Sequence, residues 1–232
     1  MNERFIIKDN HIVGVLGGMG PYAALEFHKK VLDYTHVKKD WEHIHIILDN
    51  NSKIPSRTRA VLFNEKNPSK YIINSINKLA LIGVKEVYLP CNSVHYFYDE
   101  IVPYIEIPWI NMIKVVSNYI LKFNLKNVLV LGAYITMDYK IYNKFVSDLI
   151  YLNEEHKNLV YEIIENVKLN KLKEANKFAK KLLNLIKDYN VKALLLACTE
   201  LTLIDTLTNS DYIIIDTNDI YAKYLVKRNK GL

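Results

Sequence analysis

The chain contains only two cysteines, and each follows a short apolar run. The run from Val84 leads to Cys91, and the run from Val191 leads to Cys198. The offset is constant, since 191 − 84 and 198 − 91 both equal 107. A duplicated unit that ends two equivalent strands in thiols could place those thiols face to face. Such a pair suits the removal of a proton from one face of a carbon atom and its delivery to the other.

Three other roles stay open for these cysteines. Buried free cysteines commonly fill core space, a disulfide is disfavoured in a reducing cytoplasm, and His95 alone does not complete a metal-ligand cluster. Their equivalent positions favour the paired acid–base role. A helix is expected to start after each thiol, over 93–101 and 200–207. Because a helix N-terminus can lower a thiol pKa, we expect one thiolate and one thiol to coexist near neutral pH.

Further polar groups follow other strands. The turn Gly17–Pro21 opens a helix after a strand and could hold an anion, although it lacks the dinucleotide and Walker spacings. The segment Asn50–Thr58 carries Arg57, whose guanidinium could hold a carboxylate. A tight turn and an exposed arginine are equally ordinary explanations. Lys168, at a helix end, is less marked, since such lysines are usually solvated.

Strand-like and helical patterns alternate along the chain, which predicts parallel sheets flanked by helices. In such sheets ligands bind beyond the carboxyl ends of the strands, where both cysteines are expected. Strands are predicted over 12–16, 44–48, 84–89, 108–110, 128–131, 191–196 and 213–215. Helices are predicted from Pro21, over 72–80, 137–149, 172–189 and 220–226.

The pattern restarts halfway, because Val13–Gly18 resembles Val128–Ala133. We therefore predict an α/β protein of two pseudosymmetric lobes, each with a parallel or mostly parallel sheet flanked by helices, and an active site between them. The first lobe is expected to comprise residues 1–115 plus 212–232, and the second to comprise residues 116–211.

Composition fits an ordinary globular protein. The 232 residues are 50% hydrophobic and 24% charged, and the net charge is +6. Basic residues are scattered along helices such as 168–187 rather than gathered on a stripe, so we expect no nucleic-acid partner. No apolar run reaches membrane-spanning length, and Met1–Phe5 do not lead into a signal-peptide pattern. We therefore expect a cytoplasmic protein with no membrane association and reduced thiols.

Four motifs, in order along nearly the whole chain, resemble the pyridoxal phosphate-independent aspartate/glutamate racemases, and within them the aspartate racemase branch. The motifs are Gly17–Pro21, Ile54–Thr58, Pro90–His95 and Ala197–Leu201. The resemblance implies two α/β lobes with a small substrate between them, aspartate or a similar amino acid. It further implies no cofactor, no metal and usually a homodimer.

The resemblance also implies residue roles. Cys91 and Cys198 would be the catalytic acid and base, and Arg57 and Lys168 would serve the substrate carboxylates. The positions that match the family's substrate contacts are Met19, Ser56, Arg57, Thr58, Asn92, Ser93, Thr136, Lys168, Thr199 and Glu200.

Some positions depart from the family pattern. An acidic residue often stands in place of Ser56, and a threonine in place of Ser93 and Ala133; Ala133 lacks the hydroxyl. The glutamate branch fits less well, because its late Cys-Thr-His is Cys198-Thr199-Glu200 here. The open alternatives are a glutamate-type or broad-specificity racemase, an isomerase of another dicarboxylate, an inactive amino-acid-binding relative and a thiol–disulfide protein.

Overall fold

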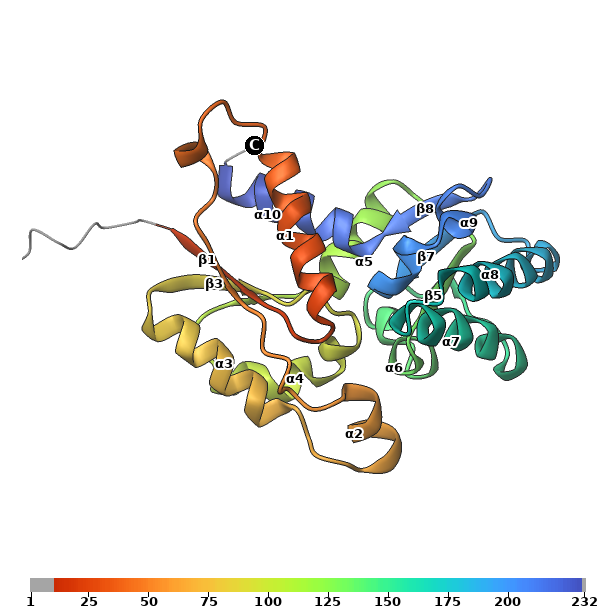
Figure 1. Cartoon of the computed structure of the whole chain (residues 1–232), viewed down its shortest axis with the longest axis horizontal. Helices are drawn as coiled ribbons and strands as arrows, with labels where there is room; N and C mark the ends of the chain where they lie inside the picture. The colour runs from red at the N-terminus through yellow and green to blue at the C-terminus, as the bar shows by residue number, and fades with distance from the viewer. Residues whose placement is uncertain (1–10, 231–232) are drawn as a thin grey trace, which may run out of the picture.

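The computed structural model describes residues 11–230, so Met1–Phe5 lie outside the described part. Two four-stranded sheets, ordered β2-β1-β3-β4 and β6-β5-β7-β8, are parallel throughout. The expected two-lobe α/β architecture is confirmed (Figure 1). The strands are β1 (Ile12–Leu16), β2 (Ile46–Asp49), β3 (Val84–Tyr88), β4 (Trp109–Ile110), β5 (Val128–Gly132), β6 (Leu149–Ile150), β7 (Ala193–Ala197) and β8 (Ile213–Asp216).

The two sheets have the same strand order, so β3 and β7 occupy equivalent positions. These are the strands that precede Cys91 and Cys198. The duplication read from the constant offset is therefore visible in the topology.

Each sheet is covered on both faces, because alternate residues of a strand point to opposite sides. In β5, Val128 and Val130 pack into a core shared by the two lobes, while Leu129 and Leu131 pack into the core of the second lobe alone. The shared core takes in helices α1 (Pro21–Thr35), α5 (Met112–Lys122) and α10 (Thr217–Lys230).

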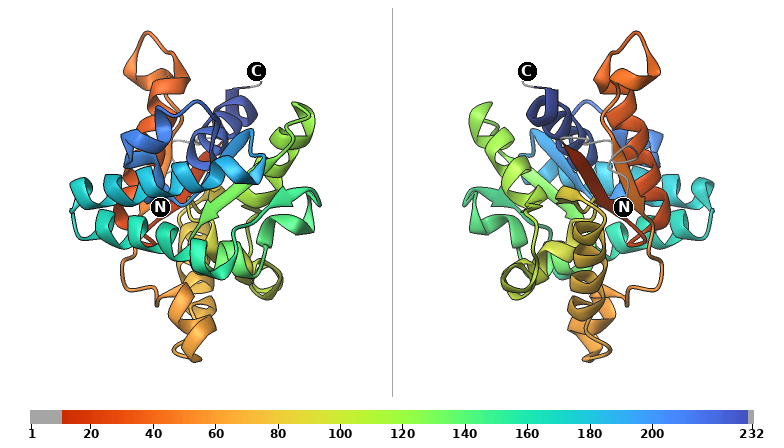
Figure 2. Two further views of the ribbon diagram at one scale, coloured as in Figure 1. Left: turned by 90° about the vertical axis from the view of Figure 1, so that its right-hand side faces the viewer. Right: turned by 90° about the vertical axis from the view of Figure 1, so that its left-hand side faces the viewer.

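The outer face of each sheet has its own helices. Helix α3 (Ser69–Leu81) covers the first sheet, and α7 (Glu154–Lys168) with α8 (Leu172–Ile186) covers the second. These outer helices lie at opposite ends of the molecule (Figure 2). Both lobes therefore pack against one apolar layer, which restricts how their strand ends can move relative to each other.

The short helices lie mainly where strands end. They are α2 (Arg57–Phe63), α4 (Tyr98–Ile101), α6 (Tyr134–Asp138) and α9 (Asp205–Thr208), with 3₁₀ helices η2 (Asp40–Glu42), η3 (Ser93–Phe97), η4 (Val102–Tyr104), η5 (Ile141–Lys144), η6 (Lys187–Tyr189) and η7 (Thr199–Leu203).

Several expectations differ from the structure. The helices expected over 93–101 and 200–207 are each a 3₁₀ helix followed by a short α-helix. The segment 137–149, predicted as one helix, contains the end of α6, the 3₁₀ helix η5 and the start of β6, because Lys140 adopts a left-handed conformation (φ 47°) that interrupts the helix. Strand β8, assigned with 212–232 to the first lobe, pairs instead with β7 of the second sheet. The helix that follows it, α10, packs against α1 and α5. The division into two domains stays a prediction.

Candidate active site

The glycine-rich turn after β1 brings a backbone carbonyl to Cys91. Gly18 has a φ of +87°, and a Cβ built there would lie 2.1 Å from the backbone of Asn51. Pro21 then begins α1, where its missing N–H is not needed. The turn is therefore packed tightly against the loop after β2, and it holds the Met19 carbonyl in place.

Cys91 follows β3 and donates a hydrogen bond from its thiol to the Met19 carbonyl, with an Sγ–O distance of 3.2 Å. Its Sγ also lies 3.4 Å from the Ser93 hydroxyl. Arg57 donates to the same Met19 carbonyl at 2.6 Å and to the Pro55 carbonyl at 3.2 Å. Arg57 thus orients the group that holds the thiol, a contact the sequence did not predict.

His95 holds the backbone of Cys91 in place. Its Nε2 accepts a hydrogen bond from the Met112 amide at 3.0 Å, so its Nδ1 carries the proton and donates to the Cys91 carbonyl at 2.9 Å. Burial lowers the pKa of His95 to about 4, which keeps the ring neutral. The residue thus orients the Cys91 backbone and is not part of a metal cluster.

Cys198 follows β7 in the second lobe and donates a hydrogen bond from its thiol to the Glu200 carboxylate at 2.8 Å. The Thr199 hydroxyl donates to the same oxygen at 3.2 Å. Burial, the Glu200 charge and the hydrogen bond to it raise the pKa of the Cys198 thiol well above its ordinary value, while Lys168 opposes the shift. Cys198 is therefore protonated at neutral pH.

The expected lowering of thiol pKa by a following helix does not hold for Cys198. The helix after it is the short 3₁₀ helix η7, and Glu200 in its first turn places a negative charge beside the sulfur. Burial of the thiol and the Glu200 carboxylate together raise the Cys198 pKa more than a helix dipole lowers it.

Several observations place the two thiols near each other. Cys91 is among the groups that raise the pKa of the Cys198 thiol, so the two side chains lie within electrostatic reach. A Cβ built on Gly20 of the first lobe would lie 3.9 Å from the Glu200 carboxylate of the second. Helices α2, η3 and α6 also contact one another. The strand ends of both lobes therefore meet around the two cysteines.

Lys168 ends α7 on the Cys198 side. Its ammonium pairs with Glu165 at 2.7 Å, and its side chain is half-exposed. Burial lowers the Lys168 pKa, but Glu165, Cys198 and Glu200 outweigh that effect and raise it. A cation therefore stands beside Cys198, with one of its hydrogen bonds already used by Glu165.

Some of the remaining candidate residues form hydrogen bonds within the protein, and others have a polar side-chain atom with no partner among residues 11–230. Ser56 caps α2 by accepting a hydrogen bond from the Arg59 amide at 3.3 Å. The buried Asn92 side-chain amide is hydrogen-bonded to Thr217 and Tyr142. Thr58, beside Arg57 in the first turn of α2, is partly exposed. Among the candidate residues, two carry a buried polar atom that has no hydrogen-bond partner in the described part of the chain, the Thr136 hydroxyl and the Arg57 Nε.

Sequence reasoning missed Tyr142 and Thr217. Neither belongs to a motif: Tyr142 stands between Ile141 and Asn143, and Thr217 stands between Asp216 and Asn218. Their hydrogen bonds to Asn92, which only the folded structure shows, distinguish them from other tyrosines and threonines.

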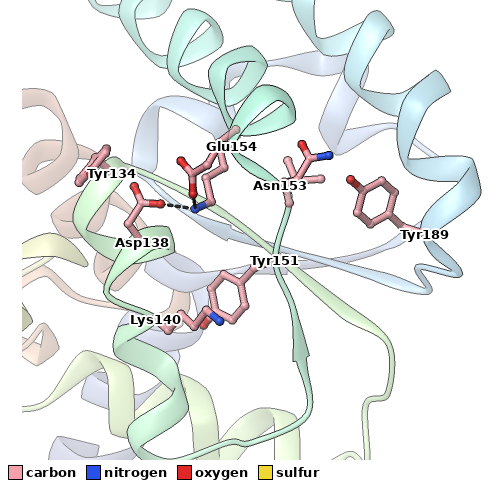
Figure 3. A pocket seen from close by; sticks show the side chains of 9 residues that line it. Tyr134, Asp138, Lys140, Tyr151, Asn153, Glu154 and Tyr189 are labelled. Carbon is pink, nitrogen blue, oxygen red and sulfur yellow. Dashed lines mark hydrogen bonds and ion pairs between the residues drawn. The ribbon is translucent and has the colours of Figure 1, made fainter.

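A cavity of about 600 Å³ opens in the second lobe but contains neither cysteine (Figure 3). It is lined by Tyr134 and Asp138 of α6 and by residues around the start of α7. Lys157, buried there, pairs with Asp138 and Glu154. Three of the charged lining residues therefore pair with one another, and neither thiol lines the cavity.

Two findings bear on other kinds of site. None of the helices formed by residues 11–230 is long and apolar enough to span a membrane. Within the same residues, His, Cys, Asp and Glu side chains form no group that could hold a metal ion.

Replacing Glu200 by glutamine is expected to lower the pKa of the Cys198 thiol, because a negative charge beside the sulfur is removed. Lys168→Met is expected to raise the pKa of the Cys198 thiol above its value in the wild-type protein, because the nearby positive charge is lost. The measurement is the pH dependence of thiol alkylation in a Cys91→Ala background, where Cys198 is the only thiol. Glu174→Gln, which changes a carboxylate paired with Lys177 on α8, is the control. An unchanged profile for Glu200→Gln would show that its carboxylate does not act on the thiol.

Each of the two parallel-sheet lobes carries a thiol at an equivalent strand end, an arrangement that suits the movement of a proton at one carbon atom. Enzymes that do this are isomerases. The sequence model described as Asp/Glu/hydantoin racemase matches residues 16–225, and the chain belongs to this family. It is an amino-acid racemase by family.

Individual relatives agree with this assignment. The broad-specificity amino-acid racemase RacX of Bacillus subtilis is 26% identical, over 93% of this chain and 96% of its own. The solved aspartate racemase of Picrophilus torridus is 29% identical with a TM-score of 0.84, covering 96% of this chain and 95% of its own. An aspartate racemase homologue from Pyrococcus horikoshii, 21% identical, shares the fold with a TM-score of 0.74 over 94% of this chain and 98% of its own.

Proposed function

We propose that this enzyme interconverts L- and D-aspartate by proton transfer between Cys91 and Cys198, without a cofactor. The observation that carries the proposal is that equivalent strand ends of the two lobes present one thiol each, within electrostatic reach of each other. The Picrophilus torridus aspartate racemase, similar over nearly the full length of both chains, supports aspartate as the substrate.

In the proposed reaction, one cysteine as thiolate removes the Cα proton and the other as thiol delivers a proton to the opposite face. The raised pKa of Cys198 suits the thiol role at rest. Cys91 then starts as the base, and the roles exchange in the reverse direction. When its proton leaves, the Cys91 sulfur stays near the Ser93 hydroxyl, which can donate to a thiolate.

A thiolate alone is a weak base for a Cα proton, and acid–base help supplies about 10²–10⁴-fold. The remaining stabilisation must act on the carbanion, whose charge spreads into the α-carboxylate. Backbone amides of Asn92, Ser93 and Thr199 stand at the starts of η3 and η7, directly after the two thiols. We assign them to that carboxylate. Arg57, Lys168, Thr58 and Thr136 are proposed to orient the substrate and its second carboxylate.

A broad-specificity racemase is the second candidate, because RacX is similar over nearly the whole chain. The remaining parts of the proposal are a homodimer and a reducing compartment, the cytoplasm, in which both thiols stay free.

The test is racemisation of a panel of L- and D-amino acids in D₂O, followed by chiral chromatography and mass spectrometry. Aspartate should be the preferred substrate, with one deuterium at Cα of each product molecule. Comparable rates with many amino acids would support the broad-specificity alternative. Binding of aspartate without Cα exchange would overturn the enzymatic proposal in favour of a binding protein.

A further inference from the structure

The Asn92 side chain, next to Cys91, is held from two sides by the rest of the fold. Its Nδ2 donates to the Thr217 hydroxyl at 3.1 Å, and its Oδ1 accepts from the Tyr142 hydroxyl. All three residues are buried, with 4%, 1% and 0% exposed surface for Asn92, Thr217 and Tyr142. An amide bound at both ends has no polar atom left to turn toward solvent.

The same network reaches the strand that leads to the other thiol. The Thr217 hydroxyl donates to the carbonyl of Leu196, at 3.1 Å, and Leu196 lies two residues before Cys198 in β7. Tyr142 comes from η5, also on the second-lobe side of the chain. Two consecutive hydrogen bonds therefore join the residue after Cys91 to the strand before Cys198.

The network has one consistent arrangement of donors. Because the Thr217 hydroxyl gives its proton to the Leu196 carbonyl, it can only accept from Asn92. The Asn92 nitrogen must then face Thr217, and its oxygen must face the Tyr142 hydroxyl. In a buried, low-dielectric setting no water replaces a lost partner, so the arrangement resists rotation of any member.

We propose that Asn92, Tyr142 and Thr217 are positioning residues that set the separation of the two thiols, an inference that rests on the proposed two-thiol reaction. Racemisation needs both sulfur atoms aligned with one Cα, and a misplacement of about 1 Å can cost roughly 100-fold in rate. A reaction that needs only one thiol is insensitive to that separation. Comparing the rates of the two reactions therefore distinguishes a changed thiol separation from a general loss of enzyme function.

The one-thiol probe is β-chloroaspartate. A thiolate takes the Cα proton, the Cα electron pair forms a Cα–Cβ double bond, and chloride leaves. The resulting enamine is hydrolysed by water to oxaloacetate and ammonium, which a coupled assay measures. No proton from the second thiol is consumed, so elimination reports on one thiol and on substrate binding.

The variants are Tyr142→Phe and Thr217→Val, each removing one hydroxyl while keeping the side-chain shape. We expect racemisation kcat to fall about 10- to 100-fold in both, with elimination kcat within about twofold of wild type. Thr217→Ser keeps the hydroxyl and should restore racemisation. Tyr139→Phe, at an exposed tyrosine three residues from Tyr142, should leave both rates unchanged.

The possible failures are distinct. If wild type racemises aspartate but the two rates fall in parallel, or neither falls, the positioning role is overturned and the proposed function stands. Equal losses in Thr217→Ser and Thr217→Val overturn it as well. If wild type does not racemise aspartate, the proposed function fails and this inference fails with it. Thermal melting of each variant confirms that the measured protein is folded.

Discussion

Cys91→Ala and Cys198→Ala are each expected to abolish aspartate racemisation, with a loss of at least about 10²–10⁴-fold. Each thiol serves one face of the Cα atom, so neither can replace the other. The position of the two thiols at equivalent strand ends, within electrostatic reach of each other, is the physical basis of this expectation. The measurement is the initial racemisation rate in D₂O from each enantiomer, with deuterium at Cα determined by mass spectrometry.

The two cysteines provide each other's control. Each single variant should still eliminate chloride from the β-chloroaspartate enantiomer whose Cα proton faces the remaining thiol, and should fail on the other enantiomer. Wild type should act on both. A single variant that racemises aspartate at the wild-type rate would falsify the two-thiol mechanism, whereas loss of all elimination in a folded variant would show that the missing thiol also shapes the site.

Gly18→Ala is expected to destabilise the protein by about 3 kcal/mol, from a left-handed backbone and a steric clash together. Gly18 has a φ of +87°, and the added Cβ would lie 2.1 Å from the Asn51 backbone, which cannot move without displacing the loop after β2. The measurement is the free energy of unfolding in urea. Because the same turn holds the Met19 carbonyl against Cys91, activity should fall in the fraction that remains folded.

Gly20→Ala is the matched control for stability. Gly20 has a φ of −100°, and the nearest atom to an added Cβ is 3.9 Å away. Its free energy of unfolding should stay close to that of wild type. Equal stability of Gly18→Ala and wild type would contradict the packing of this turn against Asn51.

The fold was largely predictable because its signals are local. Strands such as β5 and β7 are continuous apolar runs buried on both faces, and helices such as α8 repeat their apolar residues at helical spacing. The prediction failed at 137–149, where apolar residues continue but the backbone changes direction at Lys140. Apolar spacing does not report such a change, since Lys140 carries no sequence signal for a left-handed conformation.

The sequence supplies the candidate site residues but not their partners. The duplication points to the two thiols and the resemblance to Lys168, and their roles stay predictions. The resemblance suggests that Arg57 and Asn92 contact substrate, which stays a prediction. The structure adds partners that the sequence did not show, the Met19 carbonyl for Arg57 and Thr217 with Tyr142 for Asn92. A polar side chain is used by whichever group the fold brings within reach, and residue type alone does not select that group.

The sequence by itself determined that two equivalent strands end in thiols, because both the repeat and the alternation of apolar residues are properties of nearby positions along the chain. The tertiary structure decided the protonation of Cys198 and the connection between the lobes. The pKa of that thiol depends on burial and on the position of Glu200 relative to the sulfur. The connection runs from Asn92 to Thr217, 125 residues away, so it exists only once both sheets have packed against their shared core.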